Sequence, residues 1–269
     1  MSDDAEYFGD TRRTALARRS ADLWKLLKDN PRFSYYGRPV ALSDPREDTA
    51  TILSAMARLQ GAAVSNFFPS ENAEELFAEL AGQGMATDRH EHFLGGEEAL
   101  RASLKALESH RLPNDLDIVA IDAGTSRDLV ARVARLCQSC DVNPIPGAVM
   151  RGKERPGICL VALDKAGEPV ATGASFLSHH PSSPHATDAF WGMLATRPDR
   201  RGERIALLLG ARAIVHLWNS HDARGFMTGV RAGNASSRSL CESLGVMPTR
   251  WIYAWCMDPQ VFGASPVTK

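Results

Sequence analysis

Hydrophobic and polar positions in the first 112 residues follow two periods, one typical of helices and one of strands. Helices are predicted over 11–28, 49–60, 73–81 and 97–109. In the second of these, Ile52, Leu53, Met56 and Leu59 fall on one stripe. Short apolar runs predict strands over 62–68 and 86–94. Gly-Arg-Pro at 37–39 marks a turn, and Leu-Pro-Asn at 112–114 marks a linker.

Beyond residue 114 the predicted elements follow one another more densely. Strands are predicted over 116–121, 158–163, 169–177, 188–196, 226–231 and 249–257, and helices over 126–139, 202–219 and 235–244. Asp-Lys-Ala-Gly at 164–167 forms a hairpin turn, and 143–156 and 178–185 are loops. We therefore expect an α/β (α+β) fold in which helices flank a mixed sheet, with a smaller N-terminal α/β portion over 1–112 and a second domain over 113–269.

Composition narrows the class of protein. The chain has 269 residues, 44% hydrophobic and 23% charged, and its 31 basic and 32 acidic residues give a net charge of −1. That balance offers no general attraction to nucleic acid or to an anionic membrane. No run of about 18 apolar residues is present, and the acidic N-terminus has no signal-peptide core. We expect a cytoplasmic protein without nucleic-acid or membrane partners, either a monomer or a homodimer.

The five cysteines are sparse and odd in number, which is typical of reduced thiols. Cys137 and Cys140 form a C-x-x-C pair at the end of a predicted helix, whereas redox pairs open a helix. A zinc site would need two more ligands, and the adjacent His179 and His180 point opposite ways on an extended segment. We therefore expect ordinary packing and no metal.

Candidate chemistry begins in residues 194–218, where a strand leads through a polar turn into a helix. Backbone N–H groups at a helix start bind phosphate oxygens, and Gly202 allows a close approach. Arg200 and Arg201 add positive charge. Taken alone, the segment is equally consistent with a plain turn carrying solvated arginines.

A second segment, VRAGNASSRSLCESLGV at 230–246, together with the first, closely resembles the two cofactor motifs of the GCN5-related N-acetyltransferase (GNAT) superfamily. Both motifs occur in that family's order and separation, and the resemblance covers roughly residues 115–258. It implies a mostly antiparallel GNAT-like sheet and an acetyl-CoA-dependent N-acyltransferase. It also implies that the backbone from Arg201 through Gly202, Glu203, Arg204 and Ile205 to Ala206 cradles the pyrophosphate of coenzyme A.

The resemblance also places the rest of the cofactor. Leu194, Ala195 and Thr196 are expected to present the strand edge to the pantetheine arm, and Asn234 and Ser237 to hydrogen-bond the cofactor. Acetyl transfer would proceed by direct attack of an amine on acetyl-CoA.

Three positions depart from the family pattern. Arg204 replaces the first glycine of the phosphate motif, Cys241 replaces the tyrosine that protonates the leaving thiolate, and Val246 replaces a common phenylalanine. Cys241 is either a proton donor or a small buried residue. The missing tyrosine supports an alternative, a non-catalytic acyl-CoA sensor with the same fold.

The attacking amine must be neutral, so a general base is expected. Asp188 falls where some family members carry a carboxylate base, and His179, His180 and His185 precede it in a loop. The acceptor is expected to be a small-molecule amine, bound by residues 143–156 and 178–185 and by the first half. A different acyl group or an aminoacyl donor stays open.

The first half echoes the second. AVSNFFPSENAEELFAELAGQGM and FMTGVRAGNASSRSLCESLGVM both run from an apolar strand through a polar turn into a helix that ends at Gly and then Met. This similarity suggests a degenerate repeat of the same fold, with chance similarity of two strand–helix–strand units as the competing explanation.

Overall fold

The computed structural model describes residues 6–263, and the described strands form one ten-stranded sheet in the order β1-β2-β3-β10-β4-β9-β8-β7-β6-β5. The strands are β1 (Phe33–Ser34), β2 (Ala41–Leu42), β3 (Ala62–Pro69), β4 (Ala86–Gly95), β5 (Leu116–Ala120), β6 (Gly157–Asp164), β7 (Pro169–Leu177), β8 (Asp188–Thr196), β9 (Gly225–Val230) and β10 (Met247–Met257). Among them only β2–β3 and β8–β9 pair in parallel, so the sheet is mixed and mostly antiparallel, as predicted.

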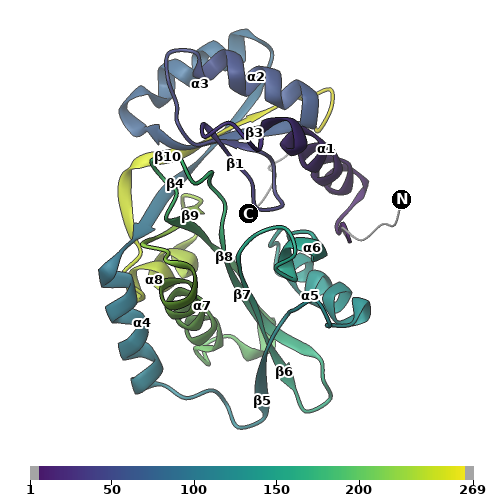
Figure 1. Ribbon diagram of the computed structural model, residues 1–269, viewed down its shortest axis with the longest axis vertical. Coiled ribbons are helices and arrows are strands. Elements are labelled where there is room, and N and C mark those ends of the chain that lie inside the picture. The colour runs from purple at the N-terminus through teal and green to yellow at the C-terminus, as the bar shows by residue number, and fades with distance from the viewer. Residues whose placement is uncertain (1–5, 264–269) are drawn as a thin grey trace.

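Helices cover both faces of this sheet. They are α1 (Thr11–Leu27), α2 (Thr49–Gln60), α3 (Ala73–Gly82), α4 (Glu97–Ser109), α5 (Arg127–Ser139), α6 (Gly147–Met150), α7 (Ile205–His221) and α8 (Ala235–Ser243), with short 3-10 turns η1 (Ser70–Asn72) and η2 (Pro198–Arg200). Around the second-half strands, α7 and α8 lie on one side together with α4 of the first half, and α5 and α6 lie on the other (Figure 1). Trp191, Leu209 and Phe226 belong to the core under the first group, and Val133, Val161 and Phe176 to the core under the second.

The two halves repeat one order of elements and exchange their last strands. The parallel pair β2–β3 is joined by α2, and the parallel pair β8–β9 by α7. A helix and a long strand follow each pair, α3 and β4 in the first half and α8 and β10 in the second. Strand β10 pairs with β3 of the first half, and β4 pairs with β9 of the second. This arrangement agrees with the predicted degenerate repeat and joins both halves in one sheet.

Most predicted elements lie within two residues of their expected bounds, and three differences are larger. The helix expected from 202 begins at Ile205, because Gly202 and Arg204 have left-handed φ angles of 85° and 61° that a helix does not accept. The expected loop 143–156 contains the four-residue helix α6, which buries its residues Gly147–Met150 behind Pro146. Strands β1 and β2 were not predicted, since two residues give no period.

The proposed boundary between 112 and 113 falls in the segment between α4 and β5, and it stays a prediction.

Strands β8 and β9 separate partway along their length. They pair only from Asp188, opposite Gly225, to Phe190, opposite Met227. At the paired end a Cβ on Gly225 would lie 2.0 Å from Asp188 Oδ1, so this close approach requires glycine. On the other edge of β8 the register with β7 shifts by one residue, and Met193 there has a φ of 53°. Such a bulge bends and twists its strand, which carries the end of β8 away from β9.

Candidate cofactor and acceptor site

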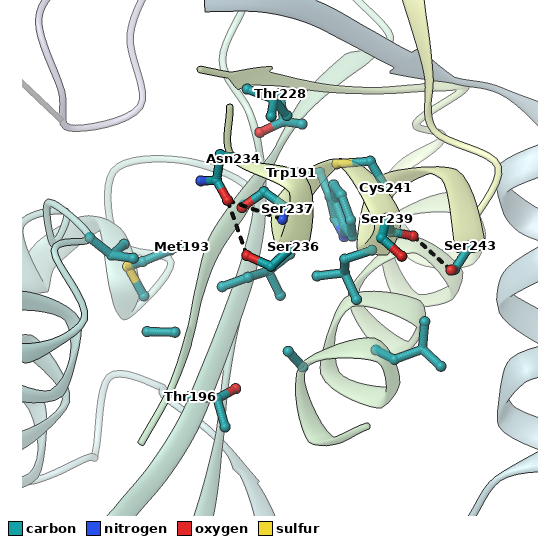
Figure 2. A pocket seen from close by; sticks show the side chains of 18 of the residues that line it. Trp191, Met193, Thr196, Thr228, Asn234, Ser236, Ser237, Ser239, Cys241 and Ser243 are labelled. Atoms are coloured by element: carbon teal, nitrogen blue, oxygen red, sulfur yellow. Dashed lines mark hydrogen bonds between the residues drawn. The ribbon is translucent and has the colours of Figure 1, made fainter. Parts of the chain in front are cut away.

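A cavity of about 1020 Å³ occupies the gap where β8 and β9 separate. Residues 190–196 of β8 and 228–230 of β9 form its walls, and the turn before α7 and the start of α8 close one end. Figure 2 shows the side chains of Thr196 and Met193 from β8, Thr228 from β9, and Asn234 and Ser237 from the start of α8 around this space. The volume is at the upper end of the usual range for ligand pockets, so it has room for more than one small group.

The turn before α7 presents backbone donors to the cavity. Gly202 has a φ of 85°, and a Cβ built there would meet no atom of residues 6–263 within 4 Å, so its backbone faces open space. Within the described residues no hydrogen bond is found from the backbone N–H of Gly202, Glu203 or Arg204. These N–H groups and the N-terminus of the 17-residue helix α7 together form a potential anion site.

The charges around this turn are also arranged for an anion. Arg200 forms ion pairs with both Glu203 (2.7 Å) and Asp115 (2.8 Å), and this pairing holds the pKa of Glu203 below its usual range. The negative charge of Glu203 is thereby offset. Arg204 contacts His110 at the end of α4, with 3.0 Å between Nη1 and Nδ1. Its side chain therefore leans toward α4.

Basic side chains from both halves line this end of the cavity. Arg201 and Arg204 come from the turn, and Lys105 and His110 come from α4 and the residue after it, in the first half. Lys105, Arg201 and Arg204 form no ion pair with any described carboxylate. A ligand with several negative charges would therefore find free cations beside the helix N-terminus.

The start of α8 is fixed by its own cap. The Asn234 side-chain oxygen accepts hydrogen bonds from the Ser237 backbone N–H (3.2 Å) and from the Ser236 hydroxyl (3.1 Å), as Figure 2 shows. Asparagine is a favoured N-cap because it satisfies a backbone N–H at the helix start. The cap orders this corner of the cavity, and Asn234, Ser236 and Ser237 all line it.

Cys241 lines the cavity but is poorly suited to donate a proton. It is 3% exposed, and burial raises the pKa of its thiol to about 12, with a smaller contribution from the neighbouring Glu242. An ordinary thiol leaving group has a pKa of about 8.5. Proton transfer from Cys241 to such a thiolate would therefore be uphill by about 5 kcal/mol.

Replacing Cys241 by alanine is therefore expected to leave the rate of thiol release within about threefold of the wild type. A group that acts as a general acid contributes about 100-fold or more, so a loss of that size would contradict this expectation. Cys256→Ala is the matched control, because Cys256 is also a fully buried thiol and does not line the cavity. Turnover of acetyl-CoA by both variants measures the difference.

The structure does not bring Asp188 into the cavity. Asp188 lies at the paired end of β8, and its Oδ2 is 2.9 Å from His185 Nδ1. His185 in turn stacks on Phe67, with 3.5 Å between the ring centroids. His179 and His180 are also absent from the cavity lining. The predicted role of Asp188 as base is not tested by its placement, but the cavity contains other proton acceptors.

Most residues predicted to bind the cofactor do meet around this one space. Those that line it are Leu194, Ala195, Thr196, Arg201, Gly202, Arg204, Ile205, Ala206, Asn234 and Ser237, whereas Glu203 does not. Neither 143–156 nor 178–185 lines the cavity, although Asn143 holds Arg38 in place through its carbonyl (2.8 Å).

The far end of the cavity is built by residues that sequence patterns did not identify. Tyr36 and Arg38 come from the segment after β1, His90 from β4, and Tyr253 and Trp255 from β10. The turn at 37–39 was visible in the sequence, but nothing local linked it to a site more than 150 residues away. The histidines of β4 were a weak signal, since His90 and His92 place polar groups on a buried face.

The described residues include no group of three or more His, Cys, Asp or Glu side chains that could hold a metal ion. All five cysteines are buried free thiols, and Cys140 Sγ lies 3.3 Å from the Thr196 carbonyl oxygen. None of the described helices is both long and apolar enough to cross a membrane.

No protein-family model matches the chain, and no curated protein matches it. Among solved structures, a GCN5-related N-acetyltransferase from Kribbella flavida is similar, with a TM-score of 0.56 and 14% identity over 90% of this chain and 95% of that chain.

Two further solved structures have the same fold. A tandem GNAT protein from the clavulanic acid biosynthesis pathway gives a TM-score of 0.53 and 15% identity over 85% of this chain and 78% of that chain. A GCN5-related N-acetyltransferase-like protein from Streptococcus suis gives 0.52 and 19% identity over 90% and 99%. The sheet, its parting strands and these likenesses agree with the resemblance found in the sequence: the chain has the fold of the GCN5-related N-acetyltransferases.

Proposed function

We propose that this chain is an acyl-CoA-dependent N-acyltransferase that moves acetyl from acetyl-CoA to the amine of a small molecule by direct attack. The observation that carries the proposal is the continuous cavity from the N-terminus of α7 through the gap between β8 and β9. The lack of a marked acidic surface around it favours a small acceptor over a basic protein segment; Asp141 is the one acidic residue among the described ones that line it.

The residues present fit a coenzyme A thioester. The pyrophosphate would be held by the backbone N–H groups from Gly202 to Ala206 and by Arg201 and Arg204. Lys105 and His110 of the first half stand beside the same end and would bind a further phosphate. Leu194 to Thr196 would present a free strand edge to the amide groups of the pantetheine arm, since none of the described strands pairs with β8 on the β9 side beyond Phe190.

When bound, the thioester supplies an activated acyl group and a thiol leaving group. The chain itself contributes orientation, exclusion of water and fixed dipoles. Beyond Phe190 the backbone N–H groups of β8 on the open edge can polarise a carbonyl oxygen placed in the gap. Trp191 anchors this part of β8, because its indole N–H donates to the Gly210 carbonyl at 3.0 Å.

His90 is the side chain we assign as general base. It lines the cavity, it is 3% exposed, and its Nε2 has no hydrogen-bond partner among the described residues. Asp88 Oδ2 lies 3.7 Å from that nitrogen and, although it also pairs with Arg231, would help to stabilise the imidazolium that forms when a proton is taken up. Asp188 stays the alternative base from the sequence.

Replacing His90 by glutamine is expected to lower kcat by about 100-fold, because a positioned general base contributes at least that much. Asp188→Asn is expected to lower it less than about threefold. Steady-state thiol release at saturating acetyl-CoA and a turned-over amine measures both. The reverse pattern, with a large loss for Asp188→Asn alone, would assign the base to Asp188.

The alternative function is a non-catalytic acyl-CoA sensor, which the buried Cys241 in place of tyrosine supports. Calorimetric titration with acetyl-CoA, followed by thiol release across a panel of amines, separates the two. Binding with turnover of at least one amine supports the transferase. Binding without turnover on any amine favours the sensor, and no binding removes the cofactor assignment.

A further inference from the structure

The far end of the cavity, which we call the acceptor end, is lined by Tyr36, Arg38, His90, Phe190, Tyr253 and Trp255. Its walls are aromatic and flat. The rings of Tyr36 and Phe190 stack with centroids 4.0 Å apart and an angle of 10° between their planes. Tyr253 and Trp255 are 4% and 5% exposed, so only the cavity gives them open space. Surfaces of this kind hold a flat apolar body.

Four polar atoms at the acceptor end are buried and have no hydrogen-bond partner among the described residues. They are Arg38 Nε, His90 Nε2, Tyr253 Oη and Trp255 Nε1. Arginine Nε and tryptophan Nε1 can only donate, and the tyrosine hydroxyl can donate as well. Buried polar groups in native proteins are nearly always paired, so unpaired atoms that share one cavity indicate the polarity of its ligand. The complementary group is rich in acceptor oxygens.

Charge selects among such groups. No ion pair joins Arg38 to a carboxylate of the described residues, and its guanidinium lies over the Phe190 ring at 5.4 Å. The contact of Arg38 Nη2 with the Asn143 carbonyl (2.8 Å) fixes the position of the guanidinium and leaves Nε unused. An arginine held in this way matches the planar geometry of a carboxylate.

We propose that the acceptor is an aminocarboxylate with a flat apolar body, whose carboxylate is bound by Arg38 and whose body packs against Tyr36, Phe190 and Trp255. This inference rests on the proposed function for the reaction but makes its own claim about binding. Both halves then contribute to acceptor binding. Tyr36 and Arg38 lie in the first half, and strand β10 of the second half lies beside first-half strand β3 because of the strand exchange.

A carboxylate at this end could instead belong to the acyl group of the donor. Succinyl-CoA carries such a group and serves as the distinguishing probe. If the carboxylate belongs to the acceptor, we expect kcat/KM for acetyl-CoA with an aminocarboxylate to be at least about tenfold higher than kcat/KM for succinyl-CoA with the plain amine. Preference for succinyl-CoA with phenethylamine would overturn it.

The direct test is binding of matched ligands to the protein saturated with coenzyme A. L-Phenylalanine and phenethylamine differ only in the carboxylate. Calorimetry is expected to give at least about 100-fold tighter binding of phenylalanine, and Arg38→Met is expected to remove most of that difference. Arg38→Lys is expected to keep part of it, which separates loss of charge from loss of fold. Arg212→Gln, an exposed change on α7, is the control.

Equal affinities for the two ligands, or a preference for phenethylamine, would overturn the inference. So would a difference that survives in Arg38→Met when that variant still binds coenzyme A. Turnover is measured separately: phenylalanine binding without acetylation would support the carboxylate site while contradicting the transferase. Acetylation of phenethylamine but not of phenylalanine would support the transferase function and contradict the inferred carboxylate site.

Discussion

Ala206→Glu is expected to weaken coenzyme A binding by roughly 100-fold without unfolding the protein. Ala206 is in the first turn of α7, is partly exposed and lines the cavity at its phosphate end. A carboxylate about 5 Å from a phosphate charge costs about 3 kcal/mol at an effective dielectric constant of about 20. The same carboxylate is favourable at a helix N-terminus, so the folded state should be unharmed. Calorimetric affinity and the melting temperature measure the two effects.

The matched control is Arg212→Gln, which lowers the net charge by the same amount on an exposed face of α7. It is expected to bind coenzyme A within about threefold of the wild type, because charges beyond a Debye length of about 10 Å are largely screened. Equal losses in both variants would mean that general charge is responsible. If Ala206→Glu binds coenzyme A with wild-type affinity, the phosphates do not bind at the N-terminus of α7.

The free energy of unfolding is expected to fall by about 4 kcal/mol between pH 7.5 and pH 5. His92 is fully buried and His179 is 7% exposed. Burial, aided by the nearby His185, lowers the pKa of each to about 3. In the unfolded chain both imidazoles have a pKa near 6.5. Below that pH the unfolded state therefore binds protons that the folded state does not bind. Each histidine then loses about 2 kcal/mol by pH 5, and carboxylates contribute little above their usual range.

Urea unfolding at the two pH values tests this dependence. His92→Gln and His179→Gln should each remove roughly half of it, whereas His180→Gln, a partly exposed neighbour, should remove little. The stability of these variants at pH 7.5 is a separate matter, since His92 Nδ1 is 3.0 Å from the Thr249 hydroxyl. An unfolding free energy that is the same at pH 7.5 and pH 5 would contradict the lowered pKa values of His92 and His179 in the folded state.

Local patterns were sufficient for elements whose period is long enough to read. The stripe on 49–60 and the apolar runs at 169–177 and 188–196 have the bounds that the structure gives α2, β7 and β8. The start of α7 was misplaced, because positive φ angles at Gly202 and Arg204 are set by the turn and not by helical period. Most residues of the predicted cofactor site come from two short motifs and line one cavity, and their role in cofactor binding stays a prediction.

Long-range pairing was not predictable from those patterns. Strand β10 lies between β3 and β4, and this exchange is decided by contacts between segments about 190 residues apart in sequence. It is also what carries Tyr253 and Trp255 against His90, which faces Tyr253 across the β4–β10 pair. The acceptor end therefore depends on topology, and no motif in the chain encodes it.

The first half repeats the order of elements but not the residues of the proposed phosphate site. Where the second half has Arg201 and Gly202 before α7, the turn before α2 has Asp44, Glu47 and Asp48. Asp48 is bound to Arg32 at 2.7 Å. Arg46 of the same turn pairs with Asp44 at 2.6 Å, so neither arginine is left unpaired for a pyrophosphate, and strand β2 is only two residues long. We therefore expect one cofactor site in each chain.

The measurement that tests the central claim most directly is a calorimetric titration of the whole chain with coenzyme A. The account predicts one binding site per chain, and it predicts that Ala206→Glu weakens that site while Arg212→Gln leaves it intact. The absence of binding to the wild-type protein, or a second site of equal affinity that Ala206→Glu does not affect, would contradict it.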